Sequence, residues 1–359
     1  MDTNKFVNMQ IKKIIVHQIF QREEKTTMIQ PFYSSSCCVL DGNYTNKIKD
    51  RIVKAMGNGS HSLRMEIVDS DDESVYKIIS EYWKNGNEEE QFITISQKLT
   101  LLLANAQNNR RYPGGIIIFV EGTVQYNSKP IFCIIKAEEQ DGFSLKKSVE
   151  NLGLSYVANI FMTKNEKFQK IGVFINNAVK GREIKANDID CFIFDSNTDP
   201  SISKSKAEYF YKSFLGLDFR KDSDVLTQSF AENTKSFIKS LEEISDVEKI
   251  KLSTSLISYI SSDGITVINP TDFAKNNFKS PEIIDKYLKY LTDRSVEVNS
   301  IHKNVAMLGN FLKTRNLLFS NKVKLQIPVD EFDESVEITK NDANGETIVR
   351  IKGQMLNEK

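Results

Sequence analysis

The chain has 359 residues, of which 40% are hydrophobic, and its 48 Lys and Arg residues balance its 48 Asp and Glu residues. A chain with this length and apolar content can bury a sizeable core without metals or disulfides. The zero net charge excludes a protein that coats a polyanion through overall positive charge, so any anion-binding surface must be a local group of cations. The first residues lack the pattern of a signal peptide, and no apolar stretch is long enough to cross a membrane, so we expect a cytoplasmic protein.

The first 200 residues predict a domain of strands and helices. β-branched and aromatic runs predict strands, at 11–20, 116–120, 131–135, 170–176 and 190–195. Apolar side chains at helical spacing predict helices, at 45–56, 73–84 and 91–108. The runs 116–120 and 131–135 are continuously apolar and are separated by the turn residues Asn127 and Ser128. They therefore predict an antiparallel hairpin that is covered on both faces.

After residue 200 the pattern changes to helix, and then to short strands. Helices are expected at 207–215, at 223–244, after the capping box of Ser245 and Glu248, and from Pro281 onward. Strands are expected at 323–328, 336–338 and 347–351.

These elements predict an α+β fold with two domains. A polar, turn-rich stretch near 197–203 marks the expected boundary. Residues 1–200 would form a mixed or antiparallel sheet with flanking helices. Residues 201–359 would form a helical region that ends in a small C-terminal β-sheet.

The sequence lacks the well-known catalytic motifs, including GxSxG, the P-loop, HExxH and GxGxxG. No CxxC occurs, and Cys133 and Cys191 lie in apolar runs, which predicts buried free thiols. His17 lies within the first strand, where a hydrogen-bonded structural histidine is the simplest interpretation. We therefore expect no catalytic residues, no metal and no cofactor, and a binding protein rather than an enzyme.

Glu121 and Lys136 keep one enzymatic alternative open. A PD-(D/E)xK nuclease places an acid on one strand and an E-x-K on the next, so that carboxylates hold Mg²⁺. Here the position two residues before Lys136 is Ile134, so the second carboxylate is missing. A metal-dependent nuclease remains an alternative with a serious departure from the pattern.

Two stretches are locally basic and form the candidate DNA-binding surface. Residues 146–185 contain eight Lys and Arg against three Glu, and residues 301–329 contain five and no Asp or Glu. Such residues would contact phosphates and would supply affinity without sequence preference. A solvated surface face is the competing interpretation. The candidate residues are Lys164, Lys167, Lys180, Arg182, Lys303, Lys313, Arg315, Lys322 and Lys324.

Residues 269–292 also permit a helix-turn-helix, in which the second helix reads base edges. Its exposed residues would be Glu282, Asp285, Lys286 and Lys289, a nearly neutral set. Because phosphates repel carboxylates, simple helical packing is the preferred interpretation.

Four segments together resemble the NdpA/YejK family of nucleoid-associated proteins. They occur in the family's order and span nearly the whole chain: Ile15-Val16-His17-Gln18-Ile19 followed by Arg22-Glu23-Glu24, Gly114-Gly115-Ile116-Ile117-Ile118-Phe119, Tyr209-Phe210-Tyr211-Lys212-Ser213-Phe214-Leu215-Gly216, and Thr347-Ile348-Val349-Arg350-Ile351-Lys352-Gly353. The chain departs from the family after Gly353 and in its acidic 69–90 region. The resemblance implies association with the bacterial nucleoid and carries no catalytic residue with it.

We therefore expect a cytoplasmic, nucleoid-located protein that binds double-stranded DNA largely independently of sequence, through phosphate contacts. Besides the nuclease, one alternative is a partner-binding component of a bacterial defence assembly, for instance against phage. The acidic 69–90 region would then be the docking or DNA-mimicking surface. The sequence leaves a protein partner and a homodimer open.

Overall fold

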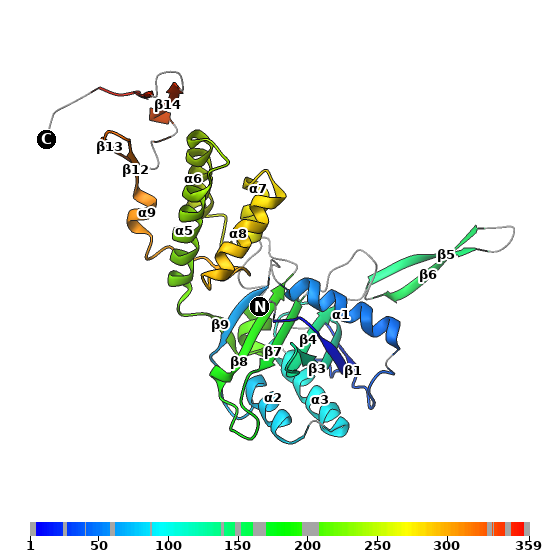
Figure 1. The fold of residues 1–359 in the computed structure, drawn as a ribbon. Coiled ribbons are helices and arrows are strands. Elements are labelled where there is room, and N and C mark those ends of the chain that lie inside the picture. Colours follow the sequence, from blue (N-terminus) through cyan, green and yellow to red (C-terminus); the bar gives the residue numbers. More distant parts are fainter. Residues whose placement is uncertain are drawn as a thin grey trace. The chain divides into compact units, whose positions relative to one another are not determined.

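The computed structural model describes residues 5–23, 27–39, 41–57, 62–86, 88–137, 140–147, 152–160, 170–195, 208–328, 332, 334–341 and 346–354 (Figure 1). The chain divides into two compact units, Met1–Arg220 and Lys221–Lys359. Each unit contains a hydrophobic core of its own. The boundary predicted near 197–203 falls on residues outside the described ranges.

The first unit is built on a seven-stranded sheet in which every neighbouring pair is antiparallel. The strand order is β1-β3-β4-β7-β8-β2-β9. The strands are β1 (Gln10–Ile19), β2 (Leu63–Ile67), β3 (Gly115–Val124), β4 (Lys129–Ala137), β7 (Lys170–Asn176), β8 (Ile189–Asp195) and β9 (Leu217–Phe219). The predicted β3–β4 hairpin is confirmed, and the sequence did not predict β2 or β9. Two further unpredicted strands, β5 (Gln140–Lys147) and β6 (Leu152–Ile160), form a separate hairpin.

Helices cover both faces of this sheet, as the continuously apolar strands predicted. On one face, Ile52 and Met56 of α1 (Gly42–Met56) join a core with Ile118, Cys133 and Val173. The other face carries α2 (Val75–Lys84), α3 (Glu89–Ala106) and the π-helix η2 (Tyr209–Phe214). There the Phe132 ring centroid lies 6.2 Å from that of Tyr82 in α2 and 5.8 Å from that of Phe92 in α3.

Both edges of the sheet are short or partly covered. The outer edge of β1 bonds to the segment that follows it, because the backbones of Gln18 and Phe32 exchange hydrogen bonds and Cys38 donates its N–H to the carbonyl of Ile14. The opposite edge is β9, which has only three residues. Cys133 and Cys191 are buried free thiols, as expected.

The second unit is mainly helical and ends in small antiparallel hairpins, which confirms the predicted α+β class. Its helices are α5 (Ser223–Ser240), α6 (Asp246–Ser261), α7 (Pro270–Asn277), α8 (Pro281–Asp293) and α9 (Gly309–Lys313). Its strand pairs are β10 (Val267–Ile268) with β11 (Ile301–His302), β12 (Thr314–Leu318) with β13 (Lys324–Pro328), and β14 (Val336–Asn341) with β15 (Glu346–Ile351).

Aromatic side chains fill the core of the second unit. The Phe237 ring centroid lies 5.2 Å from that of Tyr287, and the hydroxyl groups of Tyr287 and Thr234 are 2.7 Å apart. The capping box predicted at Ser245 and Glu248 is present at the start of α6. The helix expected over 223–244 ends earlier, at Ser240, because Leu241 turns extended and packs into the core. No helix among the described residues has the length and apolar content needed to span a bilayer.

Candidate functional site

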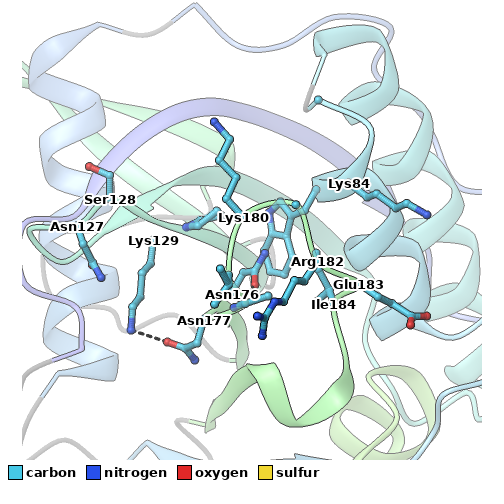
Figure 2. A pocket seen from close by; sticks show the side chains of 16 residues that line it. Lys84, Asn127, Ser128, Lys129, Asn176, Asn177, Lys180, Arg182, Glu183 and Ile184 are labelled. Atoms are coloured by element: carbon cyan, nitrogen blue, oxygen red, sulfur yellow. Dashed lines mark hydrogen bonds between the residues drawn. The ribbon is translucent and has the colours of Figure 1, made fainter.

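A pocket of about 910 Å³, with many polar and charged residues in its lining, lies at one end of the sheet in the first unit (Figure 2). Three segments line it: Trp83, Lys84 and Gly86 at the end of α2, residues 127–130 at the β3–β4 turn, and residues 176–184 after β7. Antiparallel pairing explains why the last two segments meet. Ile131 of β4 pairs with Ile175 of β7, so the start of β4 lies beside the end of β7.

Hydrogen bonds hold the segment after β7 at both ends. The Asn176 side chain accepts a bond of 2.8 Å from the N–H of Ala178, which is an Asx turn. The Asn177 backbone N–H donates to the carbonyl of Asp188 at 2.8 Å. At the far end, the Tyr76 hydroxyl of α2 donates to the carbonyl of Ile184 at 2.9 Å. This pocket wall is therefore ordered by the fold itself.

A buried carboxylate, Asp190, supports the same wall from β8. Lys5 and Arg64 form ion pairs with it, and the Asn177 amide donates to it at 3.0 Å. Burial raises the pKa of Asp190, but the Lys5 hydrogen bond and the charges of Lys5 and Arg64 outweigh that effect, so the pKa lies below its ordinary value. Asp190 therefore carries a negative charge at neutral pH that its own lysine and arginine balance.

Four cations surround the pocket, namely Lys84, Lys129, Lys180 and Arg182, against the single acid Glu183. Lys129 donates to the Asn177 side chain at 2.6 Å, shown as the dashed line in Figure 2. Within the described part of the chain, Lys84, Lys180 and Arg182 form no ion pair through their side chains. Figure 2 shows the four side chains pointing in different directions around the pocket. Such a spread suits contacts to successive phosphates better than a grip on one anion.

The structure thus brings together two of the predicted DNA-binding residues, Lys180 and Arg182, in the first unit. Lys164 and Lys167 lie outside the described residues. In the same basic stretch, Lys170 pairs with Asp195 inside the fold.

The predicted residues of the second unit are in different surroundings. Lys322 and Lys324 are exposed near the β12–β13 turn, whereas Lys313 is exposed at the other end of that hairpin. The side chain of Arg315 lies outside the described part. Lys303 donates its ammonium to the carbonyls of Ile260 and Ser262 at 3.1 and 2.6 Å, so it caps the C-terminal end of α6. Burial lowers the pKa of Lys303.

The two helices of the helix-turn-helix alternative are present, but their exposed residues do not form a surface suited to read bases. α7 and α8 occur where the sequence placed them, with Glu282, Asp285, Lys286 and Lys289 exposed on α8. Lys286 forms an ion pair with Glu243 of the same unit. The exposed set therefore remains nearly neutral, which agrees with helical packing as its role.

Glu121 and Lys136 do not form a joint site. Glu121 is opposite Phe132 in β4, four residues from Lys136, which corresponds to about 13 Å along a strand. Glu121 is paired with Lys13 at 3.0 Å, and Lys136 donates to the carbonyl of Pro113 at 3.0 Å. No group of three or more His, Cys, Asp or Glu among the described residues could hold a metal ion. The geometry removes the basis of the nuclease alternative.

His17 is a buried structural residue with hydrogen bonds at both ring nitrogens. Nδ1 accepts from the N–H of Ser34 at 3.0 Å, so the proton of the neutral ring is on Nε2, which lies 2.8 Å from Oγ of Ser96. Burial lowers the pKa of His17 to about 4. The imidazole is therefore neutral over the physiological range.

Sequence reasoning missed Lys84, Lys129, Trp83 and the two asparagines Asn176 and Asn177. Lys84 and Lys129 lie outside the basic stretches, and each is the only cation of its local segment in the pocket wall. One signal was available: Asn176 ends a predicted strand and Asn177 follows it, and Asn127 and Ser128 form the turn of the predicted hairpin. Polar turns at one edge of a sheet are frequent places for binding residues.

Comparison with known protein families gives one match. A family model described as the nucleoid-associated protein YejK matches residues 15–354. No curated protein matches the chain with significant similarity.

Proposed function

The chain belongs to the family of the nucleoid-associated protein YejK, and from this membership we propose that it binds double-stranded DNA through phosphate contacts, largely independently of base sequence. Its place would be the nucleoid in the bacterial cytoplasm. The observation that carries the proposal is the group of cations around the pocket of the first unit. Because the chain has no net charge, such a local concentration is what a balanced protein needs to attract a polyanion.

The contacts would come from cations that the fold leaves available. Lys84, Lys180 and Arg182 meet this condition in the first unit, and Lys322 and Lys324 are exposed in the second. Figure 2 shows the Lys180 and Arg182 side chains pointing in different directions, an arrangement that suits separate phosphates better than the paired contacts that read a base edge. The proposal therefore assigns them to the sugar–phosphate backbone.

Salt-titrated binding of the full chain to unrelated duplexes tests this proposal. We expect similar affinities for duplexes of different sequence, and a logarithm of the binding constant that falls linearly with the logarithm of salt concentration. Absence of binding at low salt, or binding that salt does not weaken, would overturn it.

A further inference from the structure

The pocket of the first unit has features that phosphate contacts to a duplex do not use. Its volume of about 910 Å³ lies in the range of sites for small organic ligands, roughly 300–1,000 Å³, and phosphate contacts on a duplex surface need no such cavity. Its lining combines cations with amides and with apolar groups, namely Pro130, Val179 and Ile184. A ligand that matches all three must carry negative charge, hydrogen-bonding groups and a flat or apolar part.

One buried donor in the lining has no hydrogen-bond partner among the described residues. The Trp83 side chain lines the pocket, is only 9% exposed, and its indole N–H has no hydrogen-bond partner. The Asn176 side chain is also 9% exposed, and its amide oxygen accepts a hydrogen bond from the Ala178 N–H. A buried donor without a partner costs about 1–3 kcal/mol, so groups of this kind mark places where a ligand can add stability.

An exposed aromatic ring stands next to the pocket in sequence. Tyr126 is 80% exposed, and it directly precedes Asn127 and Ser128 in the same turn. Val179, in the pocket segment after β7, is 64% exposed. Such side chains offer flat or apolar surface for stacking, and aromatic rings beside cations are the typical surface for unpaired bases.

We propose that the pocket binds an unpaired nucleotide within a DNA strand, with successive phosphates of that strand near Lys180 and Arg182 and the base against Tyr126, which adjoins the lining residue Asn127. An intact duplex offers its phosphates to such a surface but keeps its base faces stacked inside. The inference rests on the proposed function, since DNA supplies the nucleotide. It adds that single-stranded, frayed or displaced regions are bound more tightly than intact duplex.

The chain provides its own reporter for this site. Trp83 is the only tryptophan in the sequence, so its fluorescence in the full-length protein reports on the pocket. We would titrate the protein with a short oligothymidylate, a relaxed closed-circular duplex and thymidine monophosphate. We expect the oligothymidylate to change the Trp83 emission saturably and to bind at least roughly tenfold more tightly than the other two, as stacking of several bases implies.

A matched pair of variants separates stacking from charge. Tyr126→Ala should weaken oligothymidylate binding at least roughly fivefold, whereas Tyr44→Ala, which removes another exposed tyrosine of the same unit, should leave it unchanged. Equal affinity for duplex and single strand, an oligothymidylate that binds without changing the Trp83 emission, or equal behaviour of the two variants would overturn the inference while leaving duplex binding intact. Equal affinity for thymidine monophosphate and the oligomer would identify a free nucleotide as the ligand and overturn the assignment to DNA. Failure of every DNA to bind would instead reject the proposed function as well.

Discussion

Lys129 and Asn177 are joined by a hydrogen bond of 2.6 Å from the lysine ammonium to the amide Oδ1. Lys129 begins β4 and Asn177 follows β7, so this contact ties the β3–β4 turn to the neighbouring pocket segment after β7. The same amide donates to Asp190 at 3.0 Å. The pocket is therefore organised before any ligand binds, and its walls would lose little conformational freedom on association.

Removing the two predicted cations of this pocket should change how DNA binding depends on salt. Each lysine or arginine that neutralises one phosphate contributes about 0.9 to the slope of log K against log salt, so K180Q/R182Q should lower that slope by about 2. The matched control is K54Q/K98Q, which removes two exposed lysines from α1 and α3. Salt titrations with one duplex would measure both, and equal slopes for the two double variants would exclude the pocket from the interface.

Loss of the Lys303 charge should affect the stability of the fold, whereas loss of the Lys322 charge should affect DNA binding. Lys303→Gln removes the ammonium that caps the last carbonyls of α6 and should lower the free energy of unfolding by about 1 kcal/mol, with little effect on DNA affinity. Lys322→Gln removes an exposed charge and should weaken DNA binding without altering stability. Thermal melts and duplex binding on both variants test this, and DNA binding that depends on Lys303 alone would contradict it.

His17 should make stability depend on pH in a defined window. Its pKa is about 4 in the folded chain and 6.5 in the unfolded chain, so the unfolded chain binds the extra proton between these values. The contribution of neutral His17 to the free energy of unfolding is complete above pH 6.5, falls as the pH drops toward 4 and is lost below pH 4. Its total is about 3 kcal/mol at most. His17→Gln should flatten the stability curve in this window. Denaturant titrations from pH 4 to 7 measure it, and an unchanged slope would show that the histidine is not held neutral.

The ion pair of Glu121 and Lys13 should contribute to the stability of the fold and to no catalytic activity. The Glu121 side chain is 2% exposed and that of Lys13 is 18% exposed, so removing one partner leaves a poorly hydrated charge. Glu121→Met should cost about 3 kcal/mol, and Glu121→Met with Lys13→Met should recover most of that loss. Plasmid incubated with the wild-type protein and Mg²⁺ or Mn²⁺ should remain intact. Additive effects of the two substitutions, or metal-dependent cleavage lost in Glu121→Met, would contradict this interpretation.

Gly216 should tolerate no side chain. Its φ is +67°, its carbonyl accepts the N–H groups of Val68 and Asp69, and an added Cβ would lie 2.7 Å from Cβ of Asp69. Gly216→Ala should therefore cost about 2–3 kcal/mol. Gly86 also has positive φ, but no atom lies within 4 Å of its added Cβ, so Gly86→Ala should cost only about 1 kcal/mol. Thermal unfolding of both variants measures the two losses of stability, and their difference is the cost of the clash with Asp69. Equal losses would show that the structure around residue 216 shifts to remove this clash.

The elements that sequence predicted well are those with a strong local signal. Strands β3 and β4 are apolar at consecutive positions, and β7 and β8 lie at or within one residue of the expected ranges. Strand β2 was missed because its five residues alternate with Arg64 and Glu66, and β9 because it has three residues. Such strands exist through pairing with partners far away in sequence, here Phe192 and Phe219.

The candidate site was predictable only in part for the same reason. Lys180 and Arg182 stood out through local charge density, whereas Lys84 and Lys129 come from a helix end and a hairpin turn that the sheet brings to the same edge. Asn176 was expected only as the end of a strand, and Asn177 had no predicted role. Their role in the pocket wall depends on Asp190 and Lys129, which only the tertiary structure places beside them.

The backbone hydrogen bonds that Phe32 and Cys38 make to the outer edge of β1 have a consequence for the protein in a crowded cell. A β-strand with free N–H and C=O groups can pair with a strand of a neighbouring molecule, and this is a common start of aggregation. The backbone of Phe32 and the N–H of Cys38 already occupy groups of Gln18 and Ile14, and the other margin of the sheet offers only three residues. Deleting residues 32–38 should therefore promote self-association of a chain whose balanced charge gives it little electrostatic protection.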